Sequence, residues 1–211
     1  VGLHSLGSSG PLLAVQPDAL HWLDRQGKIL KRLDLSEQVL SSLALTDGSL
    51  LFEGASNIGM VTGGPDKPLL HALASVQRAQ PGQSFSPFAS DRSGKVLAVA
   101  ENQAISFWNA QAQSQGQLVC PGVRAVALSG DGRWLAALSS AGLFSSQKLH
   151  LWRLPGREPQ ALPESLEVLK SGPGPVQLHF GPDGHWLLAR NNDAYAVFEI
   201  PTGKVLAHWE E

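Results

Sequence analysis

Short apolar runs alternate with polar turns along the whole chain. The stretch SGDGRWLAALSS at Ser129–Ser140 shows the pattern, and GPDGHWLLARNN at Gly181–Asn192 repeats it closely. Apolar runs of about four to eight residues bounded by Gly, Pro, Asn or Asp are typical of β-strands. Asp-Gly tolerates the positive φ that tight hairpin turns require. The pattern therefore predicts antiparallel strands joined by hairpins.

The same unit occurs five times, with the weakest copy at Leu3–Val15. Each copy has an apolar run, a glycine turn, a second run, a third run with a large aromatic residue or Met, and a fourth run. The marker glycines are Gly10, Gly48, Gly94, Gly132 and Gly184. Four antiparallel strands in about 43 residues, repeated in phase, are typical of a β-propeller blade. Blades are expected near residues 1–35, 36–74, 75–120, 121–163 and 164–211, in a single domain.

Two alternatives compete with this interpretation. The segment Ser36–Leu45 has an N-cap serine and apolar residues near helical spacing, so it is also compatible with a helix. A β-sandwich of similar size would use the same short strands and glycine turns. Sandwiches do not normally repeat one motif five times in phase, which favours the propeller.

The segment FEIPTGKVL at Phe198–Leu206 resembles the WD-x-x-TGK strand-turn-strand segment of WD40-like β-propellers, and LDRQGKIL at Leu23–Leu30 resembles it too. The resemblance covers the whole chain but is degenerate, because no copy keeps the Trp-Asp dipeptide. Bacterial propellers of the TolB type are similar as well. The resemblance implies an all-β propeller of about five four-stranded antiparallel blades. These blades form either a complete ring or part of a larger propeller.

Large aromatic residues recur at equivalent places in the repeats. Burying an indole removes roughly 150–250 Å² from water, so such side chains would dominate the adhesion between neighbouring blades. The residues expected in this core role are Trp108, Trp134, Trp152 and Trp186.

Composition excludes several classes of function. A net charge of −2 and a charged fraction of 16% do not favour nucleic acid. No run approaches 18 consecutive apolar residues, so membrane insertion is not expected. Cys120 is the single cysteine, which excludes an intrachain disulfide and a zinc site built from cysteines. The start at Val1 rather than Met favours a processed, exported chain over a cytoplasmic one.

Motifs for catalysis or metal binding are absent from the sequence. No G-x-S-x-G elbow, H-x-H or H-E-x-x-H spacing or calcium loop occurs, and SGDG at 129–132 lacks the lysine of a phosphate loop. We therefore expect no enzyme activity, no catalytic residues and neither a cofactor nor a metal. One alternative stays open, a ligand- or metal-binding propeller, or a propeller enzyme, that uses an axial channel lined by His4, Arg124 and His179.

Long loops suggest a face that binds a partner. Loops 74–84 and 163–175 lead from one blade to the next, and loop 139–147 joins the second and third strands of the fourth blade. In a propeller these loops share one face. The sequence thus predicts a noncatalytic scaffold for protein–protein interaction, whose partner either docks on this face or completes the propeller. The predicted contact residues are Leu143, Phe144, Arg78, Leu166 and Glu167.

Overall fold

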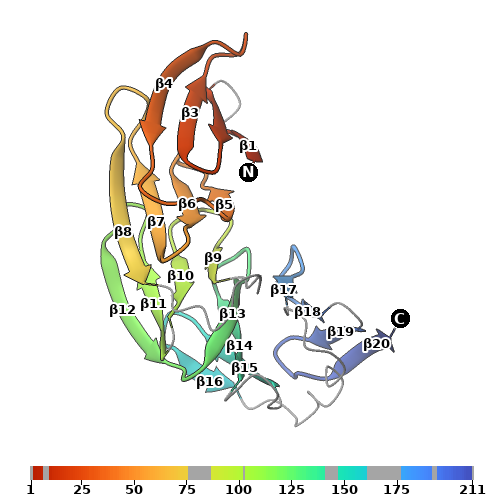
Figure 1. Cartoon of the computed structure of the whole chain (residues 1–211). Coiled ribbons are helices and arrows are strands. Elements are labelled where there is room, and N and C mark those ends of the chain that lie inside the picture. The colour runs from red at the N-terminus through yellow and green to blue at the C-terminus, as the bar shows by residue number, and fades with distance from the viewer. Residues whose placement is uncertain are drawn as a thin grey trace. The chain divides into compact units, whose positions relative to one another are not determined.

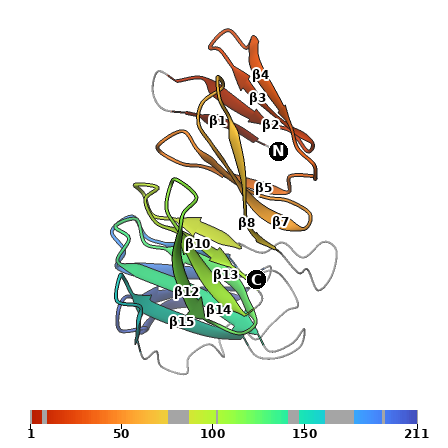
Figure 2. The ribbon, with the colours of Figure 1, turned by 90° about the vertical axis from the view of Figure 1, so that its left-hand side faces the viewer.

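A computed structural model describes residues 2–6, 10–75, 87–101, 103–140, 147–160, 177–191 and 194–210. These residues form five sheets of four antiparallel strands, and the strands of each sheet lie side by side in chain order (Figures 1 and 2). The predicted all-β class and the five four-stranded sheets are confirmed. The described ranges contain no helix of the length and apolarity needed to cross a membrane.

The sheets are termed blades 1 to 5 in chain order. Blade 1 contains β1 (Gly2–Ser5), β2 (Leu12–Val15), β3 (Ala19–Leu23) and β4 (Ile29–Asp34). Blade 2 contains β5 (Ser41–Ala44), β6 (Leu50–Glu53), β7 (Asn57–Thr62) and β8 (Leu69–Ser75). Blade 3 contains β9 (Phe88–Ser90), β10 (Leu97–Ala100), β11 (Ala104–Trp108) and β12 (Ser114–Val119). Blade 4 contains β13 (Val123–Leu128), β14 (Trp134–Ser140), β15 (Gln147–Arg153) and β16 (Glu158–Gln160). Blade 5 contains β17 (Gln177–Phe180), β18 (Trp186–Arg190), β19 (Ala194–Glu199) and β20 (Val205–Glu210).

The chain divides into two compact units. The first comprises Val1–Gln77 together with Asn109–Gln113, and the second comprises Arg78–Trp108 together with Ser114–Glu211. Blades 1 and 2 therefore belong to the first unit, and blades 3, 4 and 5 belong to the second.

Aspartates and glycines shape the hairpin turns as the sequence predicts. Asp131 Oδ1 accepts a hydrogen bond from the backbone N–H of Arg133 at 3.0 Å. In the matching turn of blade 5, Asp183 Oδ1 accepts one from the N–H of His185, also at 3.0 Å. Gly132 has a φ of 70°, in the left-handed region that side chains with a Cβ rarely adopt. The Asp-Gly pairs thus close these hairpins locally.

The alternative helix over Ser36–Leu45 is wrong. Its second half is β5, which pairs with β6, and the N–H of Leu45 donates to the carbonyl of Ser49 at 2.8 Å to close the hairpin. Val39 is only 2% exposed and packs in the core between blades 1 and 2. Strand pairing and this burial outweigh a weak local preference for helix.

Within each unit, neighbouring blades pack through apolar clusters. One cluster joins blades 1 and 2, a second joins blades 3 and 4, and a third joins blades 4 and 5. Blade 4 is buried on both faces: Leu135 and Ala137 belong to the cluster shared with blade 3, and Ala136 and Leu138 to the cluster shared with blade 5. This two-sided burial explains why its second strand is a nearly continuous apolar run.

The tryptophans divide between the predicted core role and other positions. Trp134 packs against the cluster between blades 4 and 5, and Trp152 lies in the cluster between blades 3 and 4. Trp22, which the sequence analysis did not single out, is 1% exposed in the first unit. Trp108 is half-buried, and Trp186 is half-buried on the face of blade 5 opposite blade 4. The prediction is thus correct for Trp134 and Trp152, while Trp186 is not covered by blade 4.

Candidate functional site

The five predicted partner-binding residues lie outside the described parts of the chain. These residues are Leu143, Phe144, Arg78, Leu166 and Glu167. The loop-rich face therefore stays a prediction, and the described residues point to other surfaces.

Residues proposed for an axial channel lie on inner strands or beside them. Arg124 is on β13 and half-buried, and His179 is exposed on the neighbouring strand β17. His4, in the first unit, shares a 2.9 Å hydrogen bond with Ser42 Oγ, and burial lowers the pKa of its imidazole. Within the described ranges no three side chains of His, Cys, Asp or Glu come together as metal ligands.

Cys120 is a poor candidate for a nucleophile. Its side chain is 2% exposed, within the cluster between blades 3 and 4. Burial raises the pKa of the Cys120 thiol. Because the thiolate is the reactive form of cysteine, a buried thiol with a raised pKa is chemically inert and acts as a small apolar side chain.

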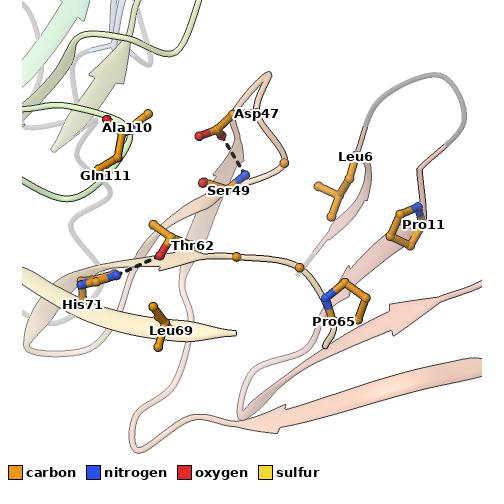
Figure 3. Close-up of a pocket in the computed structure, with 13 residues that line it drawn as sticks. Leu6, Pro11, Asp47, Ser49, Thr62, Pro65, Leu69, His71, Ala110 and Gln111 are labelled. Atoms are coloured by element: carbon orange, nitrogen blue, oxygen red, sulfur yellow. Dashed lines mark hydrogen bonds between the residues drawn. The ribbon is translucent and has the colours of Figure 1, made fainter. Parts of the chain in front are cut away.

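The first unit contains a cavity of about 580 Å³ at the hairpin turns of its strands (Figure 3). Thr62 Oγ1 and His71 Nε2 share a hydrogen bond of 2.9 Å there, and Asp47 Oδ1 accepts one from the N–H of Ser49 at 2.9 Å. These polar groups thus bond to the hairpins themselves. They stabilise the turns rather than converge on a ligand position.

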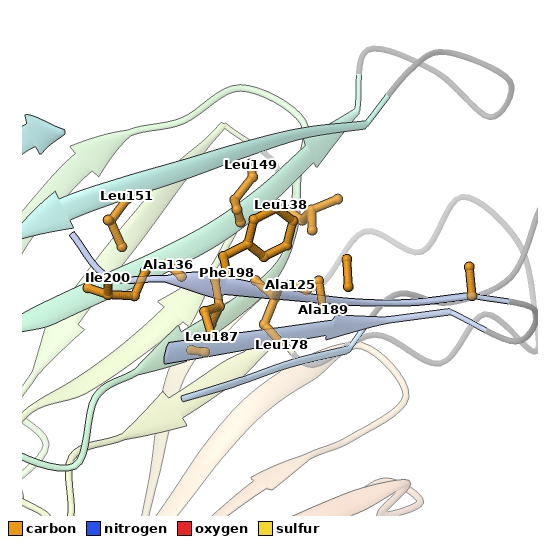
Figure 4. Packing of buried hydrophobic residues seen from close by; sticks show 13 residues of the cluster. Ala125, Ala136, Leu138, Leu149, Leu151, Leu178, Leu187, Ala189, Phe198 and Ile200 are labelled. Carbon is orange, nitrogen blue, oxygen red and sulfur yellow. The ribbon is translucent and has the colours of Figure 1, made fainter. Parts of the chain in front are cut away.

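Blade 5 is buried on one face only. Along β18 and β19 every second side chain is buried in the cluster shared with blade 4, where the Phe198 ring points toward Leu138 and Leu149 (Figure 4). The alternate side chains are half-buried or exposed. The register places these alternate side chains together on one surface, here termed the open face of blade 5: Gln177, His179, Trp186, Leu188, Arg190, Tyr195, Val197, Ala207 and Trp209.

An aromatic stack forms the outer part of this open face. The rings of Tyr195 and Trp209 are stacked, with centroids 5.7 Å apart and an interplanar angle of 12°. The guanidinium carbon of Arg190 lies 5.9 Å from the centre of the Tyr195 ring. Trp209 remains 47% exposed. Tyr, Trp and Arg are the residue types that most often dominate protein interfaces, because each combines a large apolar surface with a polar group.

Trp186 occupies the same structural position in blade 5 as Trp134 in blade 4. The N–H of Ser129 donates to the carbonyl of Trp134 at 2.9 Å, and the N–H of Gly181 donates to the carbonyl of Trp186 at 2.9 Å. Blade 5 packs against Trp134. The Trp186 indole lies over Gly181, where a Cβ atom would overlap it. On its face opposite blade 4, blade 5 thus carries Trp186, the counterpart of the tryptophan through which blade 4 packs on blade 5.

Sequence reasoning missed Tyr195, Trp209 and Arg190 as surface candidates. Apolar or aromatic residues occur on both faces of the segments YAVFEI and KVLAHW. Nothing in the alternation says which face another blade covers, so the exposed stack could be found only in the structure.

No family model matches the chain, and no curated protein matches it in sequence. Solved structures do match. The chain is similar to the β-propeller domain of Cps50 (Swd1) from Myceliophteria thermophila, with a TM-score of 0.65 and 13% identity over 95% of this chain and 70% of that one. It is similar to KlHsv2 with loop 6CD replaced by a Gly-Ser linker, with a TM-score of 0.69 and 14% identity over 99% and 67%. Kuenenia stuttgartiensis hydrazine synthase matches with a TM-score of 0.62 and 17% identity over 99% and 68%. The fold is that of a β-propeller, as the sequence predicted.

Proposed function

We propose that this protein is a noncatalytic scaffold for protein–protein interaction, and that the open face of blade 5 is one of its docking surfaces. The observation that carries the proposal is the exposed stack of Tyr195 and Trp209 beside Arg190. Covering a sheet face of this composition with another protein lowers the free energy, because apolar and aromatic surface is removed from water.

The chemistry of the face favours a protein over a small ligand. The open face is one side of a four-stranded sheet, a broad surface, whereas small-molecule sites are concave and enclose most of the ligand. Leu188 and Val197 lie directly across from each other on the central strands, with the aromatic residues and Arg190 beyond them. An apolar centre with polar groups near its edge is the usual anatomy of a protein interface.

The loop-rich face is the second proposed docking surface. Leu143 and Phe144 would act as apolar anchors, with Arg78, Leu166 and Glu167 in the adjoining loops. The double variant Leu143→Asp/Phe144→Asp should weaken partner capture from an extract of the producing cells and leave the thermal unfolding midpoint unchanged. Unchanged capture would remove this face from the proposal.

Site-specific photo-cross-linking tests the blade 5 surface directly. A photoreactive phenylalanine analogue replaces Trp209 in the intact chain, and the cells are irradiated. A discrete protein adduct is expected, and Leu188→Asp should abolish it. Val119→Asp is the matched control, because Val119 is 79% exposed on β12 of blade 3 and should leave the adduct unchanged. Absence of any protein adduct at Trp209 would contradict docking on blade 5.

A further inference from the structure

Blade 1 also has an open face. Its second strand, β2, buries Leu13 and Val15 in the cluster shared with blade 2, and the alternate residues Leu12 and Ala14 are only half-buried. The register places Leu3 opposite Ala14 and Leu23 between Leu12 and Ile29. The open face of blade 1 comprises Leu3, Leu12, Ala14, His21, Leu23 and Ile29, of which Leu3 is 64% exposed and Ile29 53% exposed.

This face repeats the pattern that blade 4 presents to blade 3. In blade 4, Leu135 lies opposite Trp152 and Ala137 lies opposite His150. In blade 1, Leu12 lies opposite Leu23 and Ala14 lies opposite His21. The two faces thus share Leu, Ala and His in the same register, with Leu23 in place of a tryptophan. In blade 4 this arrangement packs against the preceding blade.

His21 differs from His150 in its hydrogen bonding. The His150 ring shares a 2.8 Å hydrogen bond with Ser139 Oγ through Nε2. His21 is 9% exposed, yet its Nε2 has no hydrogen-bond partner within the described residues. An unpaired polar atom in a buried position costs about 1–3 kcal/mol.

The two open faces are of complementary types. Inside the chain, the blade 4 face with Trp134 packs on the blade 5 face with Leu187 and Phe198. The open face of blade 5 carries the equivalent tryptophan, Trp186, and therefore suits a face of the kind that blade 1 leaves open.

We propose that the open face of blade 5 binds the open face of blade 1 of a second copy of this chain. The inference rests on the proposed use of blade 5 as a docking surface, and it names the occupant. The contact is heterologous, because two different faces meet. After pairing, one chain keeps its blade 1 face free and the other keeps its blade 5 face free, so the pair can bind further copies.

Sedimentation equilibrium of the intact chain tests the proposal. We expect association that grows with concentration, and a loss of at least tenfold in the association constant for Leu3→Glu and for Trp209→Glu. Both side chains are exposed, so folding should survive, which circular dichroism checks. Val119→Glu is the matched control and should associate like the unaltered chain, because Val119 is exposed but lies on neither face.

Mixing the two inactive variants gives the sharpest result. The Leu3→Glu chain keeps an intact blade 5 face, and the Trp209→Glu chain keeps an intact blade 1 face. Their mixture should form a heterodimer that does not grow further. A second pair, Leu12→Asp with Leu188→Asp, repeats the test at the centre of each face.

A chain that stays monomeric at every concentration would overturn the inference. Undiminished association of both Leu3→Glu and Trp209→Glu would overturn it too, as would a mixture of these two variants that forms no heterodimer. Cross-linking at Trp209 separates this failure from failure of the proposed function. An adduct with a different protein refutes the second copy as occupant but keeps the docking surface, whereas the absence of any adduct refutes both.

Discussion

The guanidinium of Arg157 lies 4.5 Å from the centre of the Phe107 ring, so a turn of blade 4 reaches a strand of blade 3. Arg157 Nη2 also donates to the carbonyl of Gln115 at 2.6 Å, and Nη1 donates to the carbonyl of Gln117 at 3.1 Å. Both carbonyls belong to β12. One side chain therefore joins the outer edges of two blades whose inner parts share an apolar cluster.

Replacing this arginine should loosen the contact between blades 3 and 4. Arg157→Ala removes a cation–π contact and two hydrogen bonds, and we expect it to lower the free energy of unfolding by about 1–2 kcal/mol. Urea denaturation measures the change. Arg133→Ala is the control, because Arg133 has a largely exposed side chain whose ion pair with Asp131 spans 3.5 Å, and it should cost less than about 0.5 kcal/mol. Equal losses of stability in the two variants would show that Arg157 does not hold blades 3 and 4 together.

Gly181 should not tolerate a side chain. A Cβ atom there would overlap the indole of Trp186, so Gly181→Ala must displace that ring. We expect a loss of about 1–3 kcal/mol in stability and a change in tryptophan fluorescence. Gly64→Ala is the matched control, because a Cβ atom at Gly64 would meet nothing within 4 Å. A Gly181→Ala chain as stable as the Gly64→Ala chain would show that the indole moves without cost.

Phe198 should be the most sensitive position between blades 4 and 5. It is 2% exposed and contributes the largest side chain to the buried cluster there. Phe198→Ala would leave a cavity, and we expect a loss of about 3–5 kcal/mol. Because Trp134 packs against the same cluster, its emission should move to longer wavelength. Val119→Ala, at a position 79% exposed, should change neither quantity appreciably.

Much of the fold could be predicted because hairpins are encoded locally. The Asp-Gly turn at Asp131 and Gly132 carries its own hydrogen bond and positive φ, independent of distant residues. The segment Ser36–Leu45 left a helix open as an alternative to a strand, because the choice depends on burial of Val39 against another blade. Local chemistry thus specifies the strands, while contacts between blades decide the ambiguous segment.

The candidate surface could be predicted far less well. Trp134 and Trp186 occur in closely similar sequence segments, and both were expected in the core. Only Trp134 has a blade packed against it among the described residues. Which face is covered depends on the neighbouring sheet and not on the residue itself, so the open face of blade 5 and the exposed Trp209 could not be inferred from spacing.

Stability should depend on pH through His150. Burial, and to a lesser extent the positive charge of Lys148, lower the pKa of the His150 imidazole in the folded chain. The unfolded chain keeps an ordinary histidine pKa of about 6.5. As the pH falls through that value, the unfolded chain takes up a proton that the folded chain does not, so the free energy of unfolding must decrease. The contribution of the uncharged His150 to the free energy of unfolding is therefore complete above a pH of about 6.5 and is lost on acidification.

Unfolding midpoints in urea at several values between pH 7.5 and pH 5.5 measure this dependence. His150→Gln should flatten the slope, because glutamine does not titrate. Part of the slope should remain, since burial lowers the pKa of His4 as well and acts in the same direction. Lys148→Gln removes only the smaller cause and should flatten the slope less than His150→Gln does. A slope that is the same in the unaltered chain and in His150→Gln would mean that His150 takes up its proton equally in both states.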